Sequence, residues 1–128
     1  MNVLDENITA DQRELLRQWK IRTLQIGQDV GRQGMKDEHE IIPLLLQVSR
    51  PCFFTRDLGF FQDRFCHSDY CIACLAVRAD DAATFIRRAL RHQAFNTHVK
   101  RMGKVVVFQP TGIRVFKRHG AAEMRLEW

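Results

Sequence analysis

The sequence lacks any long hydrophobic run, and this absence excludes one large class of proteins. Its longest apolar stretches span a few residues, far below the ~20 that a membrane-spanning helix needs. The charged N-terminus has no apolar core of a secretion signal. Repeats and low-complexity segments are also absent, while 45% of the residues are apolar and 27% are charged. We therefore expect one globular domain, residues 1–128, that is cytoplasmic and has no membrane contact.

Cysteines are few and unevenly spaced. The chain has four, and without an export signal we expect reduced thiols rather than a disulfide framework. Cys66-His67 with Cys71 and Cys74 suggests zinc, because Cys-x-x-Cys is a common zinc-binding spacing. Within a strand, however, residues three apart point to opposite faces. We therefore expect buried core thiols, with a zinc-stabilised regulator as the alternative.

Positive charge is concentrated in the second half of the chain. The formal net charge is +5, with 9 Lys or Arg against 10 Asp or Glu in residues 1–64 and 11 against 5 in residues 65–128. A basic surface attracts polyanions and supplies phosphate contacts, so nucleic acid is a candidate partner. A basic surface without a ligand fits the same balance.

Short apolar runs alternate with segments of helical periodicity. The expected strands are 3–4, 20–26, 52–55, 71–77, 105–109 and 113–117, the last two joined as a hairpin by Pro110-Thr111-Gly112. The expected helices begin at Thr9, at Asp37 and at Asp80 or Asp81, and end near Trp19, Val48 and Leu90 to Phe95. Thr9 with Gln12 and Asp37 with Glu40 have the capping-box spacing, and Pro43 should perturb the second helix.

This alternation predicts a compact α/β sandwich with a mostly parallel sheet and a C-terminal hairpin. Ligands of such sheets gather at the carboxyl ends of the strands. Asp5 and Asp57 each follow a short apolar strand, so we expect their carboxylates at the same edge of the sheet.

Three motifs in order carry a family resemblance. They are Leu4-Asp5-Glu6-Asn7, Gly34-Met35-Lys36-Asp37-Glu38, and Phe54-Thr55-Arg56-Asp57 followed by Phe60. With the strand at 71–77 and Ile113-Arg114-Val115 in the hairpin, the chain resembles the compact PIN-like nuclease family related to VapC toxins. The resemblance implies a three-layer sandwich and a metal-dependent endoribonuclease that hydrolyses RNA, often the toxin of a toxin-antitoxin pair.

The resemblance also implies site residues and partners. Asp5, Asp37 and Asp57 match the acidic positions of the family, as catalytic residues and ligands of Mg²⁺ or Mn²⁺, which prefer hard oxygen donors. The auxiliary groups are Glu6, Asn7 and Thr55. Arg56 is the expected phosphate contact, and Arg87, Arg88 and Arg91 are expected to bind RNA or an acidic antitoxin. A homodimer is a further candidate assembly.

Each residue also has a purely structural interpretation. Asp37 with Glu40 caps a helix without any metal. Asp57 can pair with Arg56 or Arg50, Thr55 can simply fill a strand end, and the helix arginines can form a solvated face.

The chain departs from the family pattern at Gly59, where relatives usually carry a second acid. Asp63 or Asp69 could replace that acid, or the site could hold one metal. A domain that binds RNA or protein without catalysis is the alternative function.

Overall fold

A seven-stranded sheet forms the centre of the chain, which the computed structural model describes over residues 1–120 and 122–128. The sheet order is β2-β1-β3-β4-β5-β6-β7. The first five strands in this order run parallel to one another, β6 runs antiparallel to β5, and β7 runs antiparallel to β6. The bounds are β1 Asn2–Leu4, β2 Thr23–Gln25, β3 Cys52–Thr55, β4 Cys71–Leu75, β5 Lys104–Gln109, β6 Gly112–Lys117 and β7 Met124–Leu126. The predicted α/β class, parallel sheet and C-terminal hairpin are confirmed.

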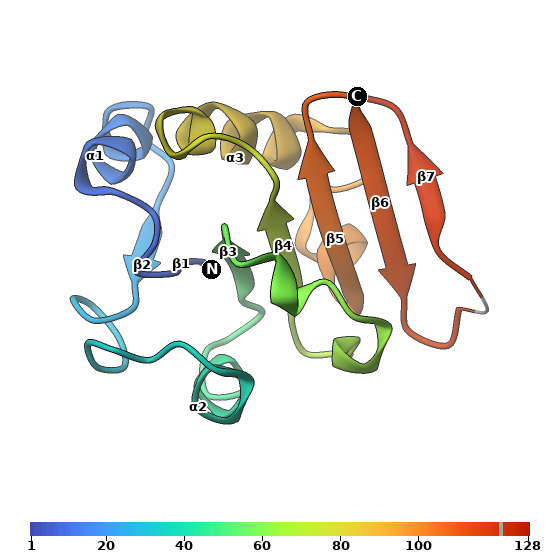
Figure 1. Cartoon of the computed structure of the whole chain (residues 1–128), viewed down its shortest axis with the longest axis horizontal. Helices are drawn as coiled ribbons and strands as arrows, with labels where there is room; N and C mark the ends of the chain where they lie inside the picture. The colour runs from blue at the N-terminus through green and yellow to red at the C-terminus, as the bar shows by residue number, and fades with distance from the viewer. Residues whose placement is uncertain (121) are drawn as a thin grey trace.

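Helices cover both faces of the sheet. On one face lie α1 (Ala10–Gln18) and α3 (Ala82–Arg91), and on the other lies α2 (Glu38–Leu45), as Figure 1 shows. Shorter turns are η1 (Leu58–Phe60), η2 (Asp63–Phe65), η3 (Ala79–Asp81) and α4 (His98–Arg101). The arrangement is compatible with the expected three-layer sandwich. In the part of the chain described, no helix has both the length and the apolar character needed to cross a bilayer.

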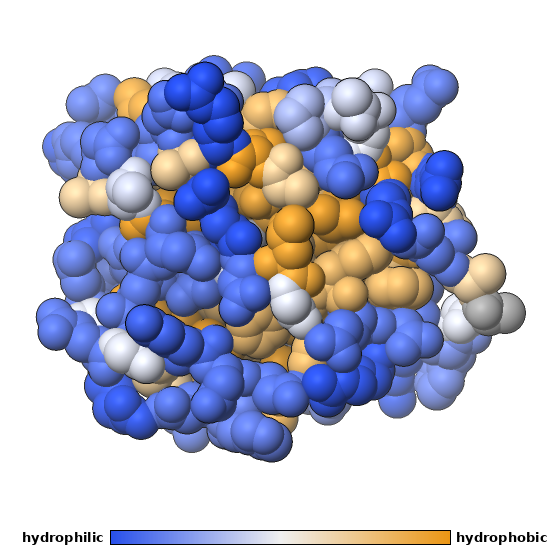
Figure 2. All heavy atoms as spheres, viewed as in Figure 1, coloured by the Kyte–Doolittle hydropathy of each residue, from blue (hydrophilic) through white to orange (hydrophobic). Residues whose placement is uncertain are grey.

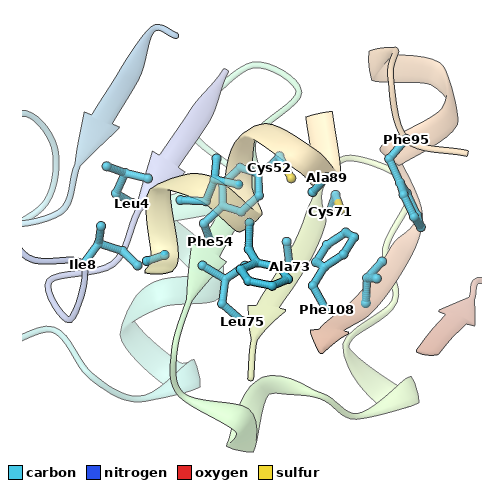
Figure 3. Close-up of a cluster of buried hydrophobic side chains, with 14 of the residues drawn as sticks. Leu4, Ile8, Cys52, Phe54, Cys71, Ala73, Leu75, Ala89, Phe95 and Phe108 are labelled. Carbon is cyan, nitrogen blue, oxygen red and sulfur yellow. The ribbon is translucent and has the colours of Figure 1, made fainter. Parts of the chain in front are cut away.

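The core is divided by the sheet into two clusters. Side chains alternate between the two faces of a strand, so successive residues of β3 and β4 contribute to different clusters. Phe54, Ala73 and Phe108 belong to the cluster on the side of α1 and α3, and Figure 3 shows them near Ala89 of α3. Phe53 and Ile72 pack on the side of α2. All of β4 is therefore buried, which explains why its sequence is apolar at every position.

The cysteines follow the same alternation. Cys71 belongs to the cluster under α1 and α3, and Cys74 belongs to the opposite cluster. All four cysteines are free thiols, and burial raises the pKa of Cys74 to about 12. A shared zinc ion on Cys71 and Cys74 is excluded by this geometry, as expected from the strand spacing.

Helix ends differ from the prediction in two places. At α1 the side chain of Thr9 makes no cap bond, and Gln12 is buried and accepts a hydrogen bond from the Ala83 amide over 2.9 Å. Helix α2 continues through Pro43 but ends at Leu45 instead of Val48. The amides of Gln47 and Val48 donate to the carbonyls three residues back, which is the tighter pattern of a helix end.

The C-terminal tail packs on the rest of the chain. Strand β7 pairs with β6, and the indole of Trp128 donates a hydrogen bond of 2.6 Å to the carbonyl of Gln109. Residues Met124–Leu126 of the tail are therefore the last strand of the sheet.

Candidate active site

The strand order places a topological switch point between β1 and β3. From β1 the chain passes through α1 to β2 on one side, and then through α2 to β3 on the other side. At such a point the connections leave in opposite directions, which opens a crevice beyond the carboxyl ends of the strands. Asp5 follows β1 and Asp57 lies two residues after β3, so both stand at this crevice.

Asp5 is held tightly at the end of β1. Only 6% of the residue is exposed, and its amide donates to the carbonyl of Phe54 over 2.9 Å. Its Oδ1 accepts from the Glu6 amide at 2.7 Å. Its Oδ2 accepts from the Thr55 hydroxyl at 2.6 Å and from the Asn7 amide group at 3.3 Å. The orientation of this carboxylate is therefore fixed by the protein.

Thr55 connects the two aspartates. Its fully buried hydroxyl donates to Asp5 and accepts from the Asp57 amide at 3.0 Å and from the Asn7 side chain at 3.2 Å. One donor and two acceptor positions are the complete capacity of a hydroxyl. Asn7 in turn accepts from the Arg56 amide at 3.1 Å. Thr55 and Asn7 thus fix the turn that carries Asp57, and Thr55 does more than fill a strand end.

Asp57 is exposed and begins η1. Its Oδ1 accepts from the Gly59 amide at 2.9 Å. The predicted alternative of an ion pair with Arg56 or Arg50 is wrong, because within the described residues neither Asp57 nor Asp5 has an ion pair. A Cβ at position 59 would come within 3.0 Å of this Oδ1, so the tight turn favours glycine at this position.

Burial raises the pKa of Asp5 above its ordinary 3.8, and the neighbouring negative charges of Asp57 and Glu6 raise it further. The hydrogen bonds from Thr55 and from the Glu6 amide act in the opposite direction. Two close carboxylates without a cationic partner disfavour full ionisation. A bound cation would remove this penalty.

The raised pKa of Asp5 predicts a pH-dependent difference in stability between wild type and Asp5→Asn. Since the folded pKa is raised, the stabilisation linked to the neutral carboxyl is complete below pH 3.8 and is lost as pH rises through the folded pKa. Asn does not titrate, and it keeps one acceptor oxygen where both oxygens of Asp5 accept hydrogen bonds. The lost acceptor is a cost at every pH, so the free energy of unfolding of Asp5→Asn relative to wild type should increase as pH rises through the folded pKa. Urea unfolding across pH measures this, and a difference that stays constant with pH would contradict the described electrostatics.

Asp37 is correctly predicted as the cap of α2. Its Oδ1 accepts from the Glu40 amide at 3.2 Å, and the side chain is exposed. Asp37 and Asp57 line one pocket of about 220 Å³, which Asp5 does not line.

The expected cluster of three aspartates is not assembled. Across residues 1–120 and 122–128, no three His, Cys, Asp or Glu side chains are arranged to hold one metal ion. Capping directs the Asp37 carboxylate toward the first amides of α2. The structure therefore brings together Asp5 and Asp57, and leaves Asp37 across a neighbouring pocket.

Two acids considered as auxiliary or replacement ligands have other positions. Glu6 accepts a 2.6 Å hydrogen bond from the Gly34 amide, which ties the loop before α2 to the end of β1. Asp69 precedes β4 and so lies at the opposite end of the strands from Asp57. It therefore lies away from Gly59 and Asp57.

Arg56 lies at the same edge of the sheet as the aspartates. Its Nε donates to the carbonyl of Val77 at 3.1 Å, which leaves its terminal nitrogens for other partners. It lines a groove of about 550 Å³ with Leu58, Arg78 and Pro110, beyond the ends of β3, β4 and β5. Figure 2 shows apolar surface gathered at the middle of this view, surrounded by hydrophilic residues. Arg78 was not predicted as a site residue, although its position three residues after the buried strand β4 could have indicated it.

The predicted arginines of α3 do not reach the aspartates. Helix α3 instead extends from α1, where the Ala83 amide donates to Gln12, to the C-terminal tail, where His92 contacts the carbonyl of Glu127. The guanidinium of Arg87 lies 3.6 Å from the ring centre of Trp19, and that of Arg88 lies 4.2 Å from Trp128. Arg91 is exposed near the end of the helix.

The site is thus a pair of carboxylates fixed by neighbouring polar groups at the switch point. Asp5 and Asp57 are the pair, Thr55 and Asn7 orient them, and Arg56 lies beside them. Comparison with protein-family models, with curated proteins and with solved structures finds no match to this chain.

Proposed function

We propose that this chain is a PIN-like, metal-dependent endoribonuclease that hydrolyses RNA phosphodiester bonds at Asp5 and Asp57. One observation carries the proposal: a buried carboxylate, Asp5, is held beside a second carboxylate with no ion pair in the described chain, at the switch point of a parallel sheet. Such a pair is unfavourable by itself and favourable around a divalent cation.

Two carboxylates are a suitable donor set for Mg²⁺ or Mn²⁺. Mg²⁺ in phosphoryl-transfer sites is usually held by one or two carboxylates, with water and substrate phosphate completing its coordination. Asp5 and Asp57 would hold the ion, and Asp37, a cap across the pocket, is not required as a ligand. When bound, the ion would offset the charge of the phosphodiester and lower the pKa of a water molecule.

The protein groups around the pair orient the carboxylates and the substrate. Thr55 and Asn7 fix Asp5 through hydrogen bonds of 2.6 and 3.3 Å, so its carboxylate needs little reorganisation. Arg56 is anchored to the end of β4 through its Nε, and its free edge can meet a phosphate oxygen beside Asp57. The toxin role and an antitoxin partner, which the family resemblance implies, stay predictions.

Cleavage of a labelled single-stranded RNA tests the proposal. We expect purified chain to cut the RNA with millimolar Mg²⁺ or Mn²⁺ and to leave it intact in EDTA. Restoring metal should restore cleavage. Cleavage that proceeds unchanged in EDTA would contradict the proposed metal dependence.

A non-catalytic RNA-binding or protein-binding module is the second candidate. It is favoured by the hydrogen bonds that both oxygens of Asp5 already accept from the protein, and by Gly59 in place of a second acid. This candidate predicts RNA binding in EDTA and no cleavage when metal is added.

A further inference from the structure

A second polar groove lies along the edge of the sheet formed by β2. It has a volume of about 510 Å³ and is lined by α1, the turn after it and the start of β2. Four of its side chains are cationic, and Asp29 is the one acid that lines it: the cations are Arg13, Arg17, Lys20 and Arg22. Residues 1–64 as a whole carry no net positive charge, so the charge balance of this half does not reveal the group of four cations.

We infer that this α1–β2 groove binds the phosphate backbone of single-stranded RNA and guides the strand toward Asp5. The inference rests on the proposed nuclease function for its substrate class. It adds a binding surface on the opposite side of Asp5 from Arg56.

Two of the four cations of the groove are available to a ligand without breaking a contact. Lys20 and Arg22 are exposed, and in the described chain their side chains make no hydrogen bond or ion pair. Arg17 is paired with Glu14, but its side chain is 75% exposed. Asp29 directs its Oδ2 to the Gln25 amide at 2.9 Å. An exposed group of cations beside an engaged acid is suited to phosphate.

The backbone at Lys20 supports a role for its side chain. Helix α1 ends in a Schellman motif, in which the Ile21 amide donates to Leu16 at 2.9 Å and the Lys20 amide donates to Arg17 at 3.0 Å. The residue at this position is left-handed, here with φ +62°. Glycine is the usual choice there because other residues are strained. A strained backbone conformation that is retained often marks a functional residue. The strained residue here is Lys20, which lines the groove.

The groove is connected to the carboxylate site by Gln25. The guanidinium of Arg13 donates to Gln25 Oε1 at 3.1 Å. The buried Gln25 amide group donates to the carbonyls of Ile8 at 2.8 Å and Asp5 at 3.3 Å. One side chain thus separates the near end of the groove from Asp5, so a strand lying in the groove ends beside the proposed reaction centre.

RNA binding in EDTA tests the groove without cleavage. Fluorescence anisotropy of a labelled oligouridylate is followed between about 50 and 200 mM KCl for wild type and for the double variant Lys20→Gln, Arg22→Gln. Each lost phosphate contact lowers the slope of log affinity against log salt by ~0.7, so the double variant should lose about 1.4. The matched control Arg118→Gln, Arg125→Gln removes two exposed charges near the opposite edge of the sheet and should keep the slope.

The variant Lys20→Gly distinguishes a loss of RNA binding from a loss of stability. Glycine relieves the left-handed strain, so Tm should rise by about 2–5 °C while RNA affinity falls. Affinity that is unchanged in both groove variants, an equal loss in the control, or binding of anionic phospholipid vesicles in preference to RNA would overturn the inference. RNA binding through the groove without cleavage in metal would reject the nuclease proposal alone, and cleavage with an unchanged salt slope would reject the groove alone.

Discussion

Asp57→Asn is expected to slow metal-dependent RNA cleavage by about 10³-fold, since losing one fixed electrostatic contact to a transition state costs ~10²–10³ in rate. Asp57 is exposed, and its one hydrogen bond accepts from the Gly59 amide. An Asn side chain keeps that acceptor, so the turn of η1 should persist and stability should change by less than about 0.5 kcal/mol. Single-turnover cleavage of labelled RNA with Mn²⁺ measures the effect.

Asp69→Asn is the matched control for Asp57→Asn. Asp69 is also an exposed aspartate, but it precedes β4 at the other end of the strands. It should cleave RNA at the wild-type rate. Wild-type cleavage by Asp57→Asn, or an equal loss in Asp69→Asn, would remove Asp57 from the proposed site.

Thr55→Val is expected to impair both folding and cleavage. Valine has nearly the shape of threonine but leaves Asp5 Oδ2 without its hydroxyl donor and the Asp57 amide without an acceptor, and it removes one of the two acceptors of the Asn7 side chain. Unpaired groups of this kind cost ~1–3 kcal/mol each, and we expect a total loss of about 2 kcal/mol after local rearrangement. Cleavage should fall by about 10–100-fold, as for residues that orient metal ligands.

Thr55→Ser separates the hydroxyl from the methyl group. Serine can make the same three hydrogen bonds, so cleavage should remain near wild type, although the lost buried methyl lowers stability by about 1 kcal/mol. Urea unfolding and single-turnover cleavage give the two readouts. If Thr55→Val cleaves like Thr55→Ser, the hydroxyl does not position Asp5.

Most of the sheet could be predicted from the sequence because burial leaves a direct pattern. Residues 52–54 and 71–75 are apolar throughout since helices or turns cover both faces, and the hairpin has its turn at Pro110-Thr111. The pair Asp5 and Asp57 was also predictable, because each follows a strand and parallel strands end at one edge.

Other features depend on contacts that a linear pattern does not record. Asp37 has the same sequence signature whether it caps a helix or binds metal, and only its position across the pocket from Asp57 separates the two. Gln12 was read as part of a capping box, while its carbonyl oxygen in fact accepts from Ala83 on α3, 71 residues away. The arginines of α3 were expected to bind RNA or an acidic antitoxin. In the structure, two of them, Arg87 and Arg88, lie against tryptophan rings.

The central claim is that Asp5 and Asp57 form one divalent-cation site, and a thermal titration with Mn²⁺ tests it most directly. Binding to the folded chain at about 100 times Kd stabilises it by ~2.7 kcal/mol, which corresponds to a Tm increase of roughly 10 °C for a domain of this size. We predict this increase for wild type and for Asp69→Asn, and none for the double variant Asp5→Asn, Asp57→Asn. A wild-type Tm that does not respond to millimolar Mn²⁺, or a double variant that responds equally, would contradict the account.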